Sequence, residues 1–214
     1  VLNADLTVKN SKIRNSGTYG IRGDSLNGKL ILVEDSEITG TQSDAIQLRD
    51  GYQNSSFTIK RNKISDSSGG GISLGYVGEV VFEGNEIKNN QNATFNLWGM
   101  YGDISFKDNA FKNNKGGVSI RDVYQSGISI LVEGNSFIEE DENSWGGYLD
   151  LNSINQEVDI LIKNNTIVNR SNGISVSGNY NNTPKILGNT IKGTRQQSTG
   201  IQVSYKSKGT IQNN

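Results

Sequence analysis

The sequence predicts an all-β chain that winds into a solenoid, a parallel β-helix of about eight coils. A short sequence motif recurs along all 214 residues, and its copies are 23 to 30 residues apart. No segment between the copies shows the 3.6-residue period of a helix. A unit of this length cannot bury its own apolar side chains, so copies must stack on one another. Each copy has one apolar anchor: Val8, Val33, Ile59, Phe82, Phe106, Val132, Ile162, Ile186 and Ile211.

Two or three short strands are expected in each unit. In the first copy Leu6 and Val8 alternate with polar residues, which indicates a strand with one face inward. Ile13 follows beyond a polar corner. About 13 residues after each anchor another strand begins, usually led by Gly, as at Gly20-Ile21 and Gly71-Ile72. Stacked copies would then form parallel sheets around a narrow apolar core.

The polar corner carries a column of related residues. Its occupants are two serines followed by seven asparagines, at Ser11, Ser36, Asn62, Asn85, Asn109, Asn135, Asn165, Asn189 and Asn214. Asn tolerates the left-handed backbone of a tight corner, and stacked amides can bond to one another along the axis. We therefore expect an asparagine ladder.

The outward position after each anchor alternates in charge. It reads Lys9, Glu34, Lys60, Glu83, Lys107, Glu133 and Lys163, with a weaker copy at Lys12, Glu37, Lys63 and Glu86. In an in-register parallel stack these side chains are direct neighbours, so alternation replaces repulsion with pairing. These charges are interpreted as structural.

Composition excludes several kinds of chemistry. With 21 basic and 22 acidic residues the net charge is −1, which argues against a nucleic-acid partner. The chain has no Cys and no His, so disulfides, thiolate metal sites and His-dependent catalysis are excluded. No apolar run is long enough to span a bilayer. We expect one domain over residues 1–214, cut from a longer chain.

A leucine-rich repeat is the competing fold, because its signature also places Asn after two strand residues. Leu is scarce here, and Ile and Val fill the inward positions. The second half of each unit also looks like a Gly-led strand rather than a helix. The β-helix is therefore favoured.

The phrase I-x-x-N-x-I followed by G-I-x-V resembles the parallel β-helix repeats of the pectin-lyase-like superfamily. The resemblance covers essentially the whole chain, implies a right-handed coil, and identifies the asparagine column with that family's ladder. It does not imply one activity, because the scaffold hosts lyases, hydrolases, epimerases, tailspikes and adhesins. The His-dependent signatures are missing. Calcium-dependent pectate lyases use carboxylates with Arg or Lys, for which Asp50, Asp122 and Asp150 are the available carboxylates.

Aromatic and charged residues gather on the Gly-led strands of the middle coils. Sugar rings stack on aromatic side chains, while hydroxyl and carboxylate groups take planar polar partners. Trp145 would join this face if it reaches it. Buried packing under loops and an assembly interface are the alternatives. The candidate site consists of Arg49, Asp50, Tyr76, Trp98, Tyr101, Arg121, Asp122, Tyr148 and Asp150.

The functional hypothesis is a secreted or cell-surface module that binds polysaccharide, of the adhesin or tailspike kind. A polysaccharide lyase or glycoside hydrolase is the second hypothesis, with Arg121 or Arg49 neutralising a uronate carboxylate and Tyr148 or Tyr101 moving a proton. A structural spacer in a surface filament is the third, and oligomers are compatible with all three. No cofactor is expected. The acidic run from Glu139 to Glu142 could bind calcium, although a solvated loop is the simpler interpretation.

Overall fold

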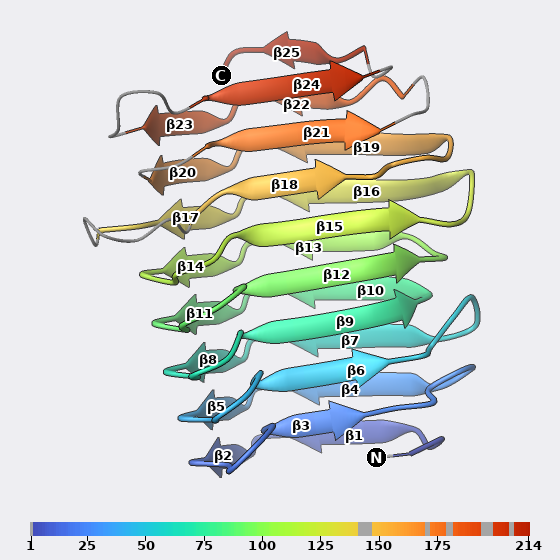
Figure 1. Cartoon of the computed structure of the whole chain (residues 1–214), viewed down its shortest axis with the longest axis vertical. Helices are drawn as coiled ribbons and strands as arrows, with labels where there is room; N and C mark the ends of the chain where they lie inside the picture. The colour runs from blue at the N-terminus through green and yellow to red at the C-terminus, as the bar shows by residue number, and fades with distance from the viewer. Residues whose placement is uncertain (1, 141–146, 170–171, 179–181, 194–198, 206–207) are drawn as a thin grey trace.

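The structure is a computed structural model that describes residues 2–140, 147–169, 172–178, 182–193, 199–205 and 208–214. Within these ranges the chain forms a solenoid of short parallel strands stacked along one axis, as Figure 1 shows. No helix occurs in the described ranges, so none there could cross a membrane. The leucine-rich alternative, which needs a different second half in each unit, is therefore wrong.

Each coil contributes one strand to each of three parallel sheets. In the described residues, sheet 1 holds nine strands: β1 (Leu6–Lys9), β4 (Leu30–Glu34), β7 (Ser56–Lys60), β10 (Glu79–Glu83), β13 (Ile104–Lys107), β16 (Ile128–Glu133), β19 (Val158–Lys163), β22 (Lys185–Leu187) and β25 (Thr210–Gln212). Sheet 2 holds eight: β2 (Lys12–Arg14), β5 (Glu37–Thr39), β8 (Lys63–Ser65), β11 (Glu86–Lys88), β14 (Ala110–Lys112), β17 (Ser136–Ile138), β20 (Thr166–Asn169) and β23 (Thr190–Gly193).

Sheet 3 is built from the Gly-led strands and faces the viewer in Figure 1. Its eight described strands are β3 (Ile21–Gly23), β6 (Ile46–Arg49), β9 (Ile72–Val77), β12 (Phe95–Met100), β15 (Val118–Val123), β18 (Leu149–Asn152), β21 (Ile174–Gly178) and β24 (Ile201–Tyr205).

The coil is right-handed. In Figure 1 the chain runs to the right along sheet 3, returns to the left behind it along sheet 1, and rises with every turn. Eight stacked strands are separated by about seven turns, so the number of turns is slightly smaller than the predicted number of coils.

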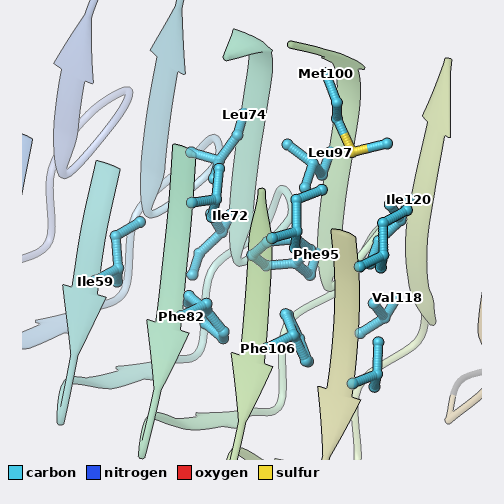
Figure 2. Close-up of a cluster of buried hydrophobic side chains, with 14 of the residues drawn as sticks. Ile59, Ile72, Leu74, Phe82, Phe95, Leu97, Met100, Phe106, Val118 and Ile120 are labelled. Atoms are coloured by element: carbon cyan, nitrogen blue, oxygen red, sulfur yellow. The ribbon is translucent and has the colours of Figure 1, made fainter. Parts of the chain in front are cut away.

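Apolar side chains from all three sheets fill the interior. Phe82 and Phe106 on sheet 1 face Phe95 on sheet 3, and all three side chains are fully buried. Their ring centroids are 4.8–5.0 Å apart (Figure 2). The inward anchors thus stack coil on coil, as the period-two alternation predicts.

The predicted asparagine ladder is present at the corner between sheets 1 and 2. Asn109 shows the pattern: its Oδ1 accepts bonds from the backbone N and the Nδ2 of Asn85, each 3.0 Å long. Its own Nδ2 donates to the backbone O of Phe82 at 3.0 Å and to Oδ1 of Asn135 at 2.9 Å. The same amide-to-amide bonding continues to Asn214. Ladder amides such as Asn109 are only 1% exposed, and they satisfy backbone groups that the corner would otherwise leave unpaired.

The backbone conformation expected for the ladder asparagines was wrong. The ladder asparagines do not adopt the left-handed backbone; the residue before each of them does, with φ between 52° and 68°. Arg61 (φ 52°) precedes Asn62, and Gly84 (φ 64°) precedes Asn85. The corner therefore bends one residue earlier, and Asn is needed at the ladder position for its hydrogen bonds alone.

A second, shorter ladder lies between sheets 2 and 3, and the sequence analysis did not predict it. Thr41 donates to Ser67 at 2.9 Å, and the backbone N of Ser67 donates to Oδ1 of Asn90 at 3.1 Å. Asn90 then donates twice to Oδ1 of Asn114, at 3.0 Å each. Glu139 stands one repeat further on and is 5% exposed. The expectation that the acidic run is a solvated loop is therefore wrong for Glu139.

The alternating charges of sheet 1 stand in register, as predicted. Lys9 aligns with Glu34 and Glu83 with Lys107 in the strand pairing. The Nζ–carboxylate distance is 3.0 Å for Lys9–Glu34 and 2.9 Å for Lys163–Glu133. Arg61 adds a second contact to Glu34 and pairs with Asp35 at 2.8 Å. The hydrogen bonds from Lys9 and Arg61 lower the pKa of Glu34 below its usual range.

Candidate functional site

Two outward columns of sheet 3 carry four of the nine predicted site residues, Arg49, Trp98, Arg121 and Asp150. Strand register aligns Arg49 with Gly75, Gly75 with Trp98, Trp98 with Arg121, and Arg121 with Asn152. Two residues earlier on the same strands, a second column reads Gln47, Ser73, Asn96, Ser119 and Asp150. Because alternate residues share a face, both columns point away from the core.

Trp98 occupies the space that Gly75 leaves on this face. A Cβ placed on Gly75 would lie 2.4 Å from the indole Cζ2 and 2.6 Å from Cε2, so the indole rests directly on the glycine backbone. The guanidinium carbon of Arg49, one coil beyond Gly75, is 5.7 Å from the centroid of the indole ring. Arg49, Gly75 and Trp98 thus form one continuous surface along the solenoid axis.

Strands of sheet 3 bend immediately after this column. Asp50, Tyr76, Gly99 and Asp122 all have left-handed backbone, with φ between 52° and 73°. Arg121 Nε lies 4.0 Å from the Asp122 carboxylate. The bend turns the following side chains along the edge of the sheet.

Four tyrosines from four successive coils meet at this edge. Ring centroids are 5.7 Å apart for Tyr52–Tyr76 and 5.8 Å for Tyr52–Tyr101. They are 6.3 Å apart for Tyr76–Tyr124 and 5.5 Å for Tyr101–Tyr124. Tyr52 and Tyr124 remain 40% and 50% exposed. The four rings therefore form a connected aromatic surface that is open to solvent at both ends.

Sequence reasoning missed Tyr52 and did not place Tyr124 in the site. A signal was present: Tyr52, Tyr76, Tyr101 and Tyr124 follow one another at intervals of 24, 25 and 23 residues, which is the repeat length. Tyrosines spaced by the repeat stand in neighbouring coils. Gln53 and Gln125 flank the cluster and are joined by a 3.1 Å hydrogen bond across it.

The surroundings of Tyr101 shift the pKa of its phenol. Burial raises the pKa of its phenol above the usual value, and the neighbouring Tyr124, Tyr52 and Tyr76 act in the same direction. Like any tyrosine phenol, Tyr101 is protonated at neutral pH, and the raised pKa makes its phenolate still less accessible, so Tyr101 is suited to donating a hydrogen bond rather than to accepting a proton.

We call this surface the aromatic patch. It contains seven of the nine predicted site residues together with the two tyrosines that were not predicted. Its members are Arg49, Asp50, Tyr52, Tyr76, Trp98, Tyr101, Arg121, Asp122 and Tyr124.

Tyr148 lies away from the patch, whereas Asp150 stands at its border, one coil and two residues from Arg121. Tyr148 aligns with Gly117, at the start of the sheet-3 strands, and its ring packs on that glycine. Seven residues separate Gly117 from Tyr124, which is about 23 Å along a strand. Asp150 accepts a hydrogen bond from Asn152. Trp145, which was expected to approach this face, lies outside the described residues.

The three predicted carboxylates stand at separate positions on the backbone of this face. Asp50 and Asp122 are three coils apart in sheet 3, so their backbones are about 14 Å apart. Asp150 is one coil from Asp122 and three residues further back along the strand, which gives a backbone separation of about 11 Å.

The described part of the chain offers no cluster of metal-binding side chains. There, no group of three or more His, Cys, Asp and Glu side chains is arranged to hold a metal ion. Of the acidic run considered for calcium, Asp141 and Glu142 lie outside the described residues. Glu140 pairs with Lys112 at 3.4 Å.

Comparison with known proteins identifies a family. Residues 1–146 match the family model described as a right-handed β-helix region. No curated protein matches the chain, and no solved structure matches it.

Proposed function

The chain belongs to the right-handed β-helix family, and on that scaffold we propose that it binds polysaccharide through the aromatic patch of sheet 3. One observation carries the proposal: the Trp98 indole and four tyrosine rings from successive coils share one surface with Arg49 and Arg121. Aromatic rings offer flat apolar faces to the C–H faces of sugars, and phenol and guanidinium groups offer hydrogen bonds to hydroxyls.

The rigidity of the patch favours binding. Its strands are fixed by parallel pairing on both sides, and Trp98 and Tyr76 pack on Gly75 and Gly99. Because their positions are held before a ligand arrives, little conformational entropy is lost on binding. Since polysaccharides are abundant at and beyond cell surfaces, the proposal includes a secreted or cell-surface location.

Binding, rather than cleavage, is the activity proposed. None of Asp50, Asp122 and Asp150 aligns with another of the three in the strand register, so their placement gives no support to a two-carboxylate hydrolase. The pKa of Tyr101 is raised, which does not favour a phenolate base. Arg49 and Arg121 remain suited to contacting polar or acidic groups of a bound glycan.

The test is affinity electrophoresis and calorimetry with neutral polysaccharides, pectate, alginate and glycosaminoglycans, with and without calcium. We expect Trp98→Ala and Tyr124→Ala each to weaken binding at least about tenfold, as loss of an aromatic contact worth about 1.4 kcal/mol would. Tyr19→Ala is the matched control, because Tyr19 also pairs with an arginine, Arg22 at 5.2 Å, outside the patch.

Two results would contradict the proposal. If Trp98→Ala and Tyr124→Ala bind every glycan as the wild type does, the patch is not the binding surface. If pectate or alginate yields products that absorb in the ultraviolet as unsaturated uronates do, the lyase hypothesis replaces simple binding.

A further inference from the structure

Two buried polar atoms beside Trp98 have no hydrogen-bond partner. They are Oε1 of Gln47 and Nε of Arg49. Gln47 is only 3% exposed although it points outward from sheet 3, away from the apolar core. Buried polar atoms without partners are uncommon in folded proteins, because each one gives up its hydrogen bonds to water.

The two side chains start from the same face of one strand. Gln47 and Arg49 are separated by one residue in β6, so their side chains leave the same face about 7 Å apart at their origins. The strand register sets Gln47 beside Ser73, and Arg49 beside Gly75, on which the Trp98 indole rests. The unpartnered pair therefore lies next to the Trp98 indole of the aromatic patch.

Their hydrogen-bonding characters are complementary. The Gln47 Oε1 atom is an acceptor, and the Arg49 Nε–H group is a donor. A single hydroxyl group can satisfy both, since it donates its proton to Oε1 and accepts the proton of Nε–H. A carboxylate cannot, because it has no proton to give to Oε1.

We propose that Gln47 and Arg49 form a subsite for a hydroxyl group of a neutral sugar, whose ring stacks on Trp98. This inference rests on the proposed function and adds the class of sugar. When ligand binds, the Arg49 guanidinium leaves the indole, the sugar ring takes its place, and the sugar hydroxyl reaches Oε1 and Nε.

The charge of the patch agrees with a neutral ligand. Arg49 and Arg121 are balanced by Asp50 and Asp122, so the patch has no net formal charge. A strongly anionic chain would gain little from long-range attraction and would meet Asp50 directly beside Arg49.

The central variant is Gln47→Met, which keeps the length of the side chain and removes the acceptor. Removing a buried carbonyl oxygen that has no hydrogen-bond partner is expected to leave the thermal midpoint within a few degrees of that of the wild type. Affinity for a neutral polysaccharide should fall at least about tenfold.

A charge variant tests the same subsite in a second way. In Gln47→Glu the new carboxylate pairs with Arg49, so it should weaken neutral-glycan binding at least about tenfold. Gln42→Glu adds the same charge to an exposed residue of the same coil and should bind as the wild type does. Circular dichroism and thermal unfolding of each variant verify that it is folded.

The outcomes separate this inference from the proposed function. If the wild type binds no polysaccharide, the proposed function fails, and this inference fails with it. If Tyr124→Ala weakens glycan binding but both folded Gln47 variants bind neutral glycan and pectate as the wild type does, the subsite is overturned while the proposed function stands. If the wild type binds pectate more tightly than every neutral polysaccharide tested, the assignment to a neutral sugar is wrong.

Discussion

Gly75 decides where the Trp98 indole lies. A side chain at position 75 would occupy the space that Cζ2 and Cε2 of the indole now fill, and the neighbouring Arg49 guanidinium depends on that placement. Tyr76 and Gly99 repeat the arrangement one residue further on, because a Cβ on Gly99 would lie 2.8 Å from the Tyr76 ring. Glycines here make room for aromatic rings.

Gly75→Ala is therefore expected to displace Trp98 without unfolding the protein. Gly75 is outside the left-handed region, and the atoms in the way are the movable end of one side chain, so the free energy of unfolding should fall by about 1 kcal/mol or less. Glycan affinity should fall at least about tenfold.

The measurement is near-ultraviolet circular dichroism and fluorescence in a Trp145→Phe background, where Trp98 is the remaining tryptophan of the two in the chain. Ser73→Ala, in the neighbouring column, is the control. An unchanged indole spectrum in Gly75→Ala would show that the glycine does not position Trp98.

At the scale of the element, the corners rather than the strands distinguish one side of the coil from another. The corner between sheets 1 and 2 carries the long ladder, and the corner between sheets 2 and 3 carries the short one. The bend at the end of sheet 3 carries the tyrosines in the middle coils. It also holds separate buried hydrogen bonds between coils, from the backbone N of Gly78 to Oγ of Ser55 and from the backbone N of Val158 to Oδ1 of Asn182. The third edge therefore combines local hydrogen bonds with exposed aromatic side chains.

Asn109→Ala tests the long ladder. The substitution removes the acceptor for two donors of Asn85 and the donor for the Phe82 carbonyl, all of them buried. At about 1–3 kcal/mol for each buried group left unpaired, we expect a loss of roughly 3 kcal/mol or more.

Chemical denaturation measures this loss. Asn96→Ala removes the same amide from an outward position of sheet 3 and should cost much less. Equal losses in the two variants would mean that the ladder amides add nothing beyond an ordinary asparagine.

At the scale of the whole molecule, stability is a sum of contacts between neighbouring coils. Aligned anchors supply the apolar part, and the ladders and the alternating charges supply polar contacts that repeat at every coil. The exposed ion pairs contribute little individually, but a shift of one coil against the next would place like charges together. Their main effect is therefore on register.

Glu83→Lys places three lysines in consecutive coils, with Lys60 and Lys107 on either side. We expect a loss of up to about 1 kcal/mol at low ionic strength. Most of it should be recovered at about 1 M salt, where the screening length is about 3 Å.

Thermal unfolding at both salt concentrations measures the effect. Glu157→Lys makes the same charge change at an exposed residue outside the column and is the control. A loss that is the same at low and high salt would rule out charge repulsion as its cause.

The sequence by itself determined the repeat, the strand positions, the long asparagine ladder and the charge register. Each of these follows from one rule, since equivalent residues of a stacked repeat become neighbours, as Asn85 and Asn109 or Glu83 and Lys107 do. Seven of the nine predicted site residues also proved to share one surface for this reason.

Only the tertiary structure decided what happens at the corners. It placed Arg61 rather than Asn62 in the left-handed conformation, and it separated Tyr148 from the patch by the length of a strand. It also brought Tyr52 into contact with Tyr101. Strand residues have a fixed direction that alternation reveals, whereas the direction of a corner side chain depends on where the backbone bends and on the glycines of adjacent coils.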